Sequence, residues 1–237
     1  MSKQKRALII GAGGIGTACV REFLKKKYTV YSTYYKNLVA KTKLEEMCGT
    51  QKVFYADVRE KNDLIKIAEA IKSEGNLDVC INAVSPPLKL KLFKDLTNEE
   101  CAEDIDTIIG GAINTAHIFL PLLNQKGSLL FLLSSVLKNH PPRMASYTLA
   151  KSAVWGLIKT LAVELRGEIR IIGISPSYVE TDLLSVFPEK FLRHIKETLP
   201  GGVFLKAKDV ANRIVEVVER PQKHSSGENI FLDTTSQ

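Results

Sequence analysis

Tyr147 and Lys151 form the most reactive pairing in the 237-residue sequence, a phenol and an amine four positions apart. Residues at this spacing lie on one face of a helix, so the two side chains would be neighbours. A free phenol has a pKa of about 10, and a cation within about 4–6 Å lowers it by roughly 1–3 units. The pair could then serve as a general acid near neutral pH. Because such pairs also arise by chance, their meaning depends on the elements around them.

A glycine-rich turn follows the first apolar segment of the chain. The segment 6–10 runs directly into Gly11, Ala12, Gly13, Gly14, Ile15 and Gly16, and a helical pattern continues to residue 27. The spacing matches GxGxxG, in which glycines allow a tight turn and bring backbone N–H groups close to a pyrophosphate at a helix N-terminus. Its position between a strand and a helix predicts a dinucleotide-binding site.

The end of the second strand-like segment indicates which dinucleotide is bound. NAD sites usually place an acid about 20 residues after the glycine turn, where it binds the ribose 2′-hydroxyl. Residues 31–36 contain no acid, and the next acid is Glu45. A 2′-phosphate beside Tyr34 would meet no repulsion and would find Lys36 as a counter-charge. We therefore expect NADP(H) to be favoured over NAD(H); the alternative is that Lys36 is a solvated loop lysine and either cofactor binds.

Composition excludes several classes of protein. The formal charge of +7 suits acidic or phosphorylated partners, but the lysines are scattered and no aromatic-basic stripe accompanies them, so we expect no nucleic-acid partner. Four cysteines without a CxxC pair predict reduced thiols in a cytoplasmic protein and no metal site. No apolar run reaches the roughly 18–20 residues of a membrane span. The apolar run 7–20 lacks a cleavage site, so we expect no export signal.

Strand-like and helical patterns alternate along the whole chain. The strand-like segments are 6–10, 28–34, 52–55, 77–81, 128–133, 169–175 and 229–232, and the helical ones are 15–27, 62–72, 99–123, 144–165 and 208–219. Strands that are apolar almost throughout are typical of parallel sheets buried on both faces. We predict one α/β domain over residues 1–237: a Rossmann-like doubly wound fold with a seven-stranded parallel sheet and helices on both faces.

The ordered set of motifs resembles the short-chain dehydrogenase/reductase family over nearly the whole chain. Besides the glycine turn and the Tyr147–Lys151 pair, the matching motifs follow successive strands in the family's order. They are Asp57-Val58, Asn82-Ala83, Ser134-Ser135, the segment from Pro176 to Thr181 and the closing segment 226–233. The resemblance implies an NAD(P)-dependent oxidoreductase.

The resemblance also assigns roles to these residues. Tyr147 would donate a proton to a carbonyl oxygen, Lys151 would lower the pKa of the phenol and bind the nicotinamide ribose, and Ser135 would orient the carbonyl. Ser134 is the alternative to Ser135, because the stretch from Ser135 to Tyr147 is one residue short. The implied cofactor contacts are Asp57 and Val58 at the adenine, Asn82 and Ala83 at the middle of the cofactor, and Val179 and Thr181 at the carboxamide.

Three departures from the family pattern indicate a divergent member. The family often has a proton-relay asparagine on the helix after strand four, and this position is Ile108 here. Asn114 is no substitute, because six residues of helix place it about 240° around the axis and 9 Å further along. Val84 and Ser177 replace two family glycines. These changes suggest an altered proton relay or a specialised substrate.

The expected activity is the reduction of a ketone to a secondary alcohol with NADPH. The nearest resemblance is to 3-oxoacyl-(acyl-carrier-protein) reductases, and a carrier-linked substrate would suit the positive charge, with rim contacts from Lys126, Lys138, Arg143 and Arg166. Another ketone, aldehyde or sugar is equally compatible. The alternative is a non-catalytic dinucleotide-binding redox sensor or assembly subunit, which the missing asparagine favours and the retained Ser135, Tyr147 and Lys151 oppose.

Two further expectations concern surfaces. Substrate would be held by the loops 84–94, 136–146 and 178–202, and the apolar residues between 183 and 192 are compatible with either a lid or the packed side of a surface helix. The helical segments 99–123 and 144–165 are apolar over wide arcs. In the family these helices pair across two-fold axes, so we expect a homodimer or homotetramer.

Overall fold

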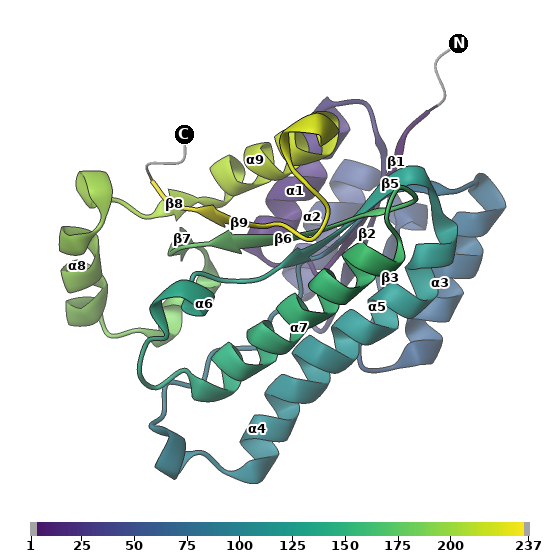
Figure 1. Cartoon of the computed structure of the whole chain (residues 1–237). Coiled ribbons are helices and arrows are strands. Elements are labelled where there is room, and N and C mark those ends of the chain that lie inside the picture. The colour runs from purple at the N-terminus through teal and green to yellow at the C-terminus, as the bar shows by residue number, and fades with distance from the viewer. Residues whose placement is uncertain (1–3, 235–237) are drawn as a thin grey trace.

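Seven parallel strands form the central sheet of the computed structural model, which describes residues 4–234. They are β1 (Arg6–Ile10), β2 (Thr29–Tyr34), β3 (Val53–Tyr55), β4 (Leu77–Asn82), β5 (Leu123–Leu132), β6 (Arg170–Pro176) and β9 (Asn229–Leu232). Their order is β3-β2-β1-β4-β5-β6-β9, and all neighbouring pairs are parallel (Figure 1). The predicted fold class is confirmed. Because the strand order reverses between β1 and β4, a ligand crevice opens there.

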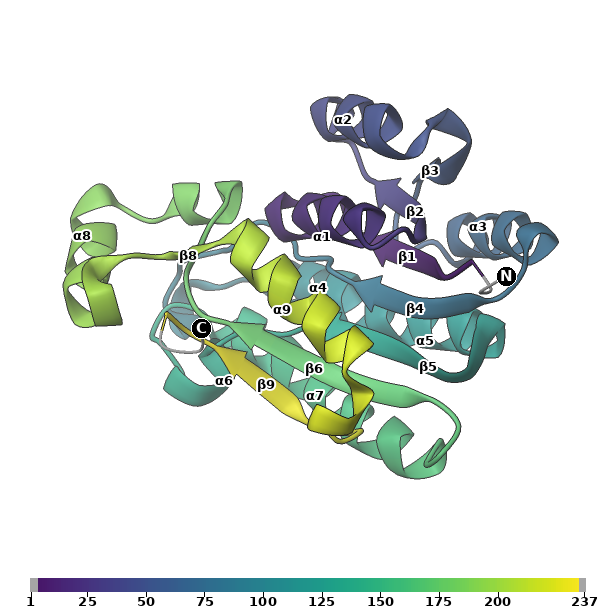
Figure 2. The same cartoon turned by 90° about the horizontal axis from the view of Figure 1, so that it is seen from above.

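Helices cover both faces of this sheet, as predicted. One layer contains α1 (Gly14–Lys25), α2 (Leu38–Cys48) and α9 (Ala207–Glu219), and the other contains α3 (Lys61–Glu74), α4 (Asn98–Asp104), α5 (Gly111–Phe119) and α7 (Ala145–Glu164). In Figure 1 α5 and α7 run side by side, and Figure 2 shows α1 and α9 together on the other face. In β1, Leu8 and Ile10 pack into one layer while Ala7 and Ile9 pack into the other. This double burial explains the continuous apolar strand.

The predicted helix 99–123 is divided into several parts. A capping box between Thr97 and Glu100 starts α4. A π-helical turn, Ile105–Gly110, then joins α4 to α5, and β5 already begins at Leu123 rather than at 128. π-helical turns inside α-helices occur frequently at functional sites.

The same stretch, Asn98–Leu122, is long and apolar enough to cross a membrane by length and composition alone, with a mean hydropathy of 1.2. The sequence expectation concerned uninterrupted apolar runs, and this stretch is not one, because it contains Asp104 and Asp106. Its side chains Ile108, Ala112 and Phe119 are buried in the protein core instead. That packing is the one expected of a core helix.

Several elements were not predicted. Only Ala40 and Leu44 of α2 are buried, so the helix lacks a clear apolar periodicity, although Asn37 caps it by accepting from the Ala40 N–H at 2.9 Å. The segment after β6 contains α8 (Glu189–Thr198), which has no buried residue. The remaining elements are α6 (Val136–Asn139), the paired strands β7 (Val179–Glu180) and β8 (Leu205–Lys206), and 3-10 turns at Thr50–Lys52, Phe93–Asp95, Leu120–Leu122, Asp182–Val186, Pro200–Gly202 and Pro221–Lys223.

Candidate active site

A cavity of about 860 Å³ opens at the carboxyl ends of the central strands. Its lining includes most of the residues expected at the site: Gly11, Gly13, Gly14, Ile15, Gly16, Tyr34, Lys36, Asp57, Val58, Ala83, Ser135, Tyr147, Lys151, Val179 and Thr181. Asn82 is the exception. Residues far apart in the sequence thus meet here because parallel strands present their carboxyl ends at one edge of the sheet.

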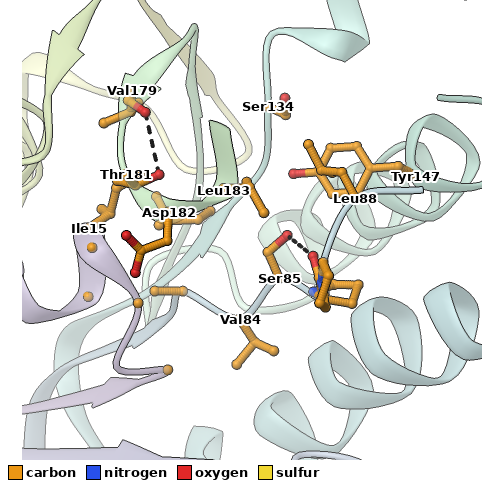
Figure 3. A pocket seen from close by; sticks show the side chains of 18 of the residues that line it. Ile15, Val84, Ser85, Leu88, Ser134, Tyr147, Val179, Thr181, Asp182 and Leu183 are labelled. Atoms are coloured by element: carbon orange, nitrogen blue, oxygen red, sulfur yellow. Dashed lines mark hydrogen bonds between the residues drawn. The ribbon is translucent and has the colours of Figure 1, made fainter. Parts of the chain in front are cut away.

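The glycine turn has the geometry of a phosphate cradle. Gly11 has a φ of +103°, and a Cβ on Gly16 would stand 1.8 Å from the carbonyl oxygen of Gly11. Thr181 lies directly over this turn (Figure 3). α1 begins at Gly14, and its N-cap, Gly13, forms no side-chain cap hydrogen bond. The first N–H groups of the helix are therefore available to phosphate oxygens, and the residues present fit a dinucleotide.

Two cations lie beside Tyr35 at the end of the cavity formed by β2 and β3. The Lys36 Nζ is 4.8 Å from the centroid of the Tyr35 ring. Arg59 donates from Nη2 to the Tyr35 hydroxyl at 3.1 Å and from Nε to Asp57 Oδ1 at 2.9 Å. These bonds from Arg59 hold the pKa of Asp57 below its usual value. The sequence analysis missed Arg59, although it directly follows the recognised Asp57-Val58 motif.

Two asparagines hold the backbone around the cavity. Asn82 donates from Nδ2 to Thr115 Oγ1 at 2.9 Å, and its Oδ1 accepts from the Val84 N–H at 3.1 Å. Both ends of this amide are used within the protein, so Asn82 fixes the end of β4 against α5 rather than lining the cavity. Asn114 donates to the Val58 carbonyl oxygen at 3.0 Å and thereby holds the segment after β3.

The Tyr147 phenol faces two serine hydroxyls. Ser85 comes from the segment after β4 and Ser134 from the segment after β5 (Figure 3). Burial raises the pKa of Tyr147, hydrogen bonding with Ser85 and Ser134 opposes this rise, and the negative charge of Asp104 adds to it. The net effect is a raised pKa of Tyr147. The Tyr147–Lys151 spacing predicted a lowered pKa instead.

The environment of Lys151 explains the difference. Its Nζ donates to the Leu132 carbonyl oxygen at 2.7 Å and lies 5.5 Å from the centroid of the Tyr147 ring. The side chain is buried, which lowers the pKa of Lys151 to about 7. An amine that is only partly charged at neutral pH and is directed at a backbone carbonyl does little to offset the desolvation of a phenol.

The two consecutive serines occupy different positions. Ser134 faces the Tyr147 phenol (Figure 3), and its Oγ accepts from the Val136 N–H at 3.3 Å. Ser135 lines the cavity as the N-cap residue of α6, and its N–H donates to the Pro176 carbonyl oxygen at 3.0 Å. The geometry therefore favours Ser134, the alternative in the sequence analysis, as the partner of the phenol.

The three departures from the family pattern have structural consequences. Ile108 is 5% exposed and packs into the core from the π-helical turn, so an apolar side chain fills the position of the relay amide. Val84 and Ser177 both line the cavity. The Ser177 Oγ is buried without a hydrogen-bond partner among residues 4–234. Such an unpaired hydroxyl is available to a bound cofactor.

The part of the cavity beside Tyr147 is mainly apolar. Its walls come from only part of each expected loop, namely residues within 84–88, 136–144 and 178–187. They include Pro86, Leu88, Val136, Met144, Tyr178, Leu183, Leu184 and Phe187. Phe187 joins this wall to α8, because its ring stacks on Phe191 with the centroids 5.2 Å apart. The apolar residues of this last segment thus connect the cavity to an outlying helix.

The four basic residues expected at the rim do not lie together: two are at the carboxyl ends of the strands and two are at the amino ends. Lys138 and Arg143 belong to the segment 136–146, which contributes to the cavity wall. Lys126 lies near the amino end of β5, and Arg166 lies in the turn before β6. Because the cavity is at the carboxyl ends of these strands, the expectation is wrong for Lys126 and Arg166 within this chain.

Comparison with known proteins matches residues 11–234 to the family model described as Enoyl-(Acyl carrier protein) reductase. The 3-oxoacyl-(acyl-carrier-protein) reductase FabG of Thermotoga maritima is 26% identical over 97% of this chain and 96% of its own. Oxidoreductase UcpA of Escherichia coli strain K12 is 30% identical over 83% of this chain and 80% of its own. The NADP-dependent mannitol dehydrogenase of Alternaria alternata is 27% identical over 98% of this chain and 91% of its own.

Solved structures share the fold at lower sequence identity. A short-chain dehydrogenase/reductase from Brucella melitensis, described as a glucose/ribitol dehydrogenase, superposes with a TM-score of 0.89 at 20% identity. The match covers 97% of this chain and 95% of that chain. The relatives differ in their named activities, whereas the solved structures share the fold.

Proposed function

Because this chain belongs to the short-chain dehydrogenase/reductase family and is an NAD(P)-dependent oxidoreductase acting on CH–OH groups, we propose that it reduces a ketone to a secondary alcohol with NADPH. One observation carries the proposal. The Tyr147 phenol is buried in the cavity wall, opposite the Ser85 and Ser134 hydroxyls, at the end of the cavity that also holds Lys151. This arrangement can hydrogen-bond and protonate a carbonyl oxygen.

The protein's own residues would act on the substrate oxygen. The bound cofactor supplies the hydride. Tyr147 donates its proton to the oxygen, and the raised pKa of the phenol keeps that proton in place at neutral pH. Ser134 orients the carbonyl, with Ser85 beside it. Lys151 would release the Leu132 carbonyl oxygen and hydrogen-bond the nicotinamide ribose. Among residues 4–234 its amine forms no ion pair with an acid that would first have to be broken.

The preference for NADPH rests on charge at the end of β2. Lys36 and Arg59 both lie beside Tyr35, and residues 31–36 contain no acid. A 2′-phosphate placed there would be attracted by two cations. Asp57 is already held by Arg59, so binding of a 2′-phosphate would compete with that pair.

The apolar wall beside Tyr147 supports an apolar substrate. A 3-oxoacyl chain on a carrier protein would suit it, and Lys138 and Arg143 would be the rim contacts for an acidic carrier. A free apolar ketone fits equally well. We place this activity in one domain spanning 1–237. We also place it in the cytoplasm, because the four cysteines are free thiols and two of them are fully buried.

One observation favours a second function, a non-catalytic dinucleotide-binding sensor or assembly subunit. Ile108 fills the position of the relay asparagine, so a route for reloading the phenol with a proton is missing at that point. Such a protein would bind NADPH but would turn over no carbonyl substrate.

The test is NADPH oxidation with a panel of 3-oxoacyl thioesters, apolar ketones and sugars, repeated with Tyr147→Phe. The substitution keeps the ring and deletes the transferable proton, so kcat should fall by roughly 10²–10⁴-fold while NADPH affinity changes little. Tyr28→Phe is the matched control, because Tyr28 lies beside the amino end of β2 and its hydroxyl binds Glu219. Equal turnover by wild type and Tyr147→Phe would rule out Tyr147 as the acid. NADPH binding without any turnover would favour the sensor.

A further inference from the structure

A buried carboxylate, Asp104, lies one helical turn before Ile108 and takes no part in the chemistry described above. It is 2% exposed. Its Oδ2 accepts from the Ser146 hydroxyl at 2.5 Å, and its Oδ1 accepts from Lys89 Nζ at 2.8 Å. A buried carboxylate is costly unless it is paired and hydrogen-bonded, and here both oxygens have partners.

The three residues of this network, Lys89, Asp104 and Ser146, come from three different segments of the chain. Lys89 follows the wall segment 84–88, and its Nζ also contacts the Glu100 carbonyl oxygen at 3.2 Å and Glu103 at 3.0 Å on α4. Asp104 ends α4. Ser146 is 3% exposed and directly precedes Tyr147. A single carboxylate thus joins the wall segment, α4 and the turn that carries the general acid.

The first turn of α7 depends on this connection, because it has little local support. Its N-cap residue, Met144, forms no side-chain cap hydrogen bond, and the turn contains no acidic residue. Side-chain caps normally satisfy the free N–H groups at a helix start and fix its direction. Here the Ser146–Asp104 hydrogen bond attaches the turn to a neighbouring helix instead.

We propose that Asp104 is a positioning residue that, through Ser146 and Lys89, holds the Tyr147 phenol against the Ser85 and Ser134 hydroxyls. The inference rests on the proposed role of Tyr147 as general acid. The charged groups that face the phenol are Lys151 on the same helix and Asp104 on α4, and Lys89 and Glu103 surround Asp104. The negative charge of Asp104 favours the protonated phenol, so Asp104 acts on both the position and the ionisation of Tyr147.

Ser146→Ala tests the positional role without changing any charge. It removes the hydrogen bond to Asp104 and leaves the Lys89–Asp104 ion pair intact. We expect kcat to fall roughly 10- to 100-fold with little change in NADPH affinity, because small misplacements of a catalytic group are costly. Ser152→Ala is the matched control, since the exposed Ser152 hydroxyl bonds only the Thr148 carbonyl oxygen of the same helix, at 2.8 Å. It should retain the wild-type kcat.

Asp104→Asn tests the effect of the charge, with the exposed Asp106→Asn as its control. The full-length protein, labelled with 13Cζ-tyrosine, is titrated by NMR, and the Tyr147 resonance is assigned from its absence in Tyr147→Phe. We expect the midpoint of the Tyr147 titration to move down by about half a pH unit or more in Asp104→Asn and to stay in place in Asp106→Asn. In Ser146→Ala the resonance itself should shift, and in Ser152→Ala it should not.

These readouts separate the two proposals. If wild type and Tyr147→Phe turn over equally, the proposed function fails, while the NMR titrations still test whether Asp104 acts on Tyr147. If Ser146→Ala matches Ser152→Ala in kcat and in the Tyr147 resonance, Asp104 is not a positioning residue. Should Asp104→Asn fail to fold because Lys89 loses one of its two carboxylate partners, the Ser146→Ala comparison alone decides.

Discussion

At the scale of single residues, Lys151 is a side chain whose burial is costly to the folded protein. Its amine is 3% exposed, and its hydrogen-bond acceptor is the Leu132 carbonyl oxygen rather than a carboxylate. An ammonium group without an acidic partner is expensive to bury, so the proton is held weakly. Residues needed for binding and catalysis commonly carry such a cost, because the site must be ready for a ligand that the free protein lacks.

Lys151→Met should therefore stabilise the protein while removing activity. Folding lowers the pKa of Lys151 from its usual 10.5 to about 7. Well below pH 7 both the folded and the unfolded chain hold the proton and the burial penalty is complete, whereas the penalty declines as the pH rises through 7 towards 10.5. We expect the variant to melt about 5 °C above wild type at pH 6.5, with a smaller difference at pH 9.5. Melting curves at both pH values check this, and a destabilised variant at both would contradict it.

A second residue-scale prediction separates the two serines. Ser134 faces the phenol, whereas Ser135 starts α6 and binds Pro176 through its backbone. Loss of a hydroxyl that orients a carbonyl costs about 10²-fold in kcat. We expect Ser134→Ala to show such a loss and Ser135→Ala to remain within a few-fold of wild type in steady-state kinetics. The reverse ranking would restore Ser135 to the role that the sequence alone favoured.

At the scale of elements, the ends of β2 and β3 set the charge around the adenosine end of the cavity. Their carboxyl ends meet because the two strands pair in register, with Tyr34 opposite Tyr55. Lys36 follows one strand and Arg59 follows the other, so neither strand alone predicts the pair of cations. Lys36 could be predicted from the sequence because it lies where NAD sites usually carry an acid, whereas no comparable signal marks Arg59.

The preference for NADPH over NADH should change when residues at the carboxyl ends of β2 and β3 are substituted. Arg59→Ala removes one cation and frees Asp57, so NADPH affinity should fall roughly tenfold relative to NADH affinity. Tyr34→Asp should shift the preference toward NADH, because a carboxylate repels the 2′-phosphate. Fluorescence titration with both cofactors measures this, with Arg21→Ala on the exposed side of α1 as the control. Equal affinities of wild type for NADPH and NADH would refute the proposed preference.

At the scale of the whole molecule, the outer faces of the helices around α7 suggest an assembly. Leu149 and Val163 are 58% and 64% exposed on α7, and Gly156 lies between them with open space beyond its Cα. Ile113 of α5 is 38% exposed, and Gly110 also borders open space. Small residues between exposed apolar ones allow close helix approach, which suits a two-fold interface.

We therefore expect a dimer or tetramer at micromolar concentration. Leu149→Arg should convert it to a smaller species, because a buried unpaired guanidinium disrupts an apolar interface. Light scattering on wild type and variant measures the mass. Lys208→Ala on the other layer of helices is the control and should leave the mass unchanged. A monomeric wild type would show that these faces do not associate.

The sequence by itself determined the fold class, the strands of the sheet and the family. These rest on local and ordered signals: apolar segments of strand length, a glycine turn after the first of them, and motifs at the ends of successive strands. The helices α2 and α8 gave no such signal, because few or none of their residues are buried.

Only the tertiary structure decided how the side chains of the site are arranged. Asn82 hydrogen-bonds Thr115. Ser134 rather than Ser135 faces the phenol, and Arg59 lies with Lys36 beside Tyr35. The tertiary structure also decides that the pKa of Tyr147 is raised, because the rise comes from burial and from Asp104 on another helix. Spacing along a chain predicts neighbours within one element. Orientation, desolvation and contacts between elements depend on how distant segments pack, and no local pattern encodes that packing.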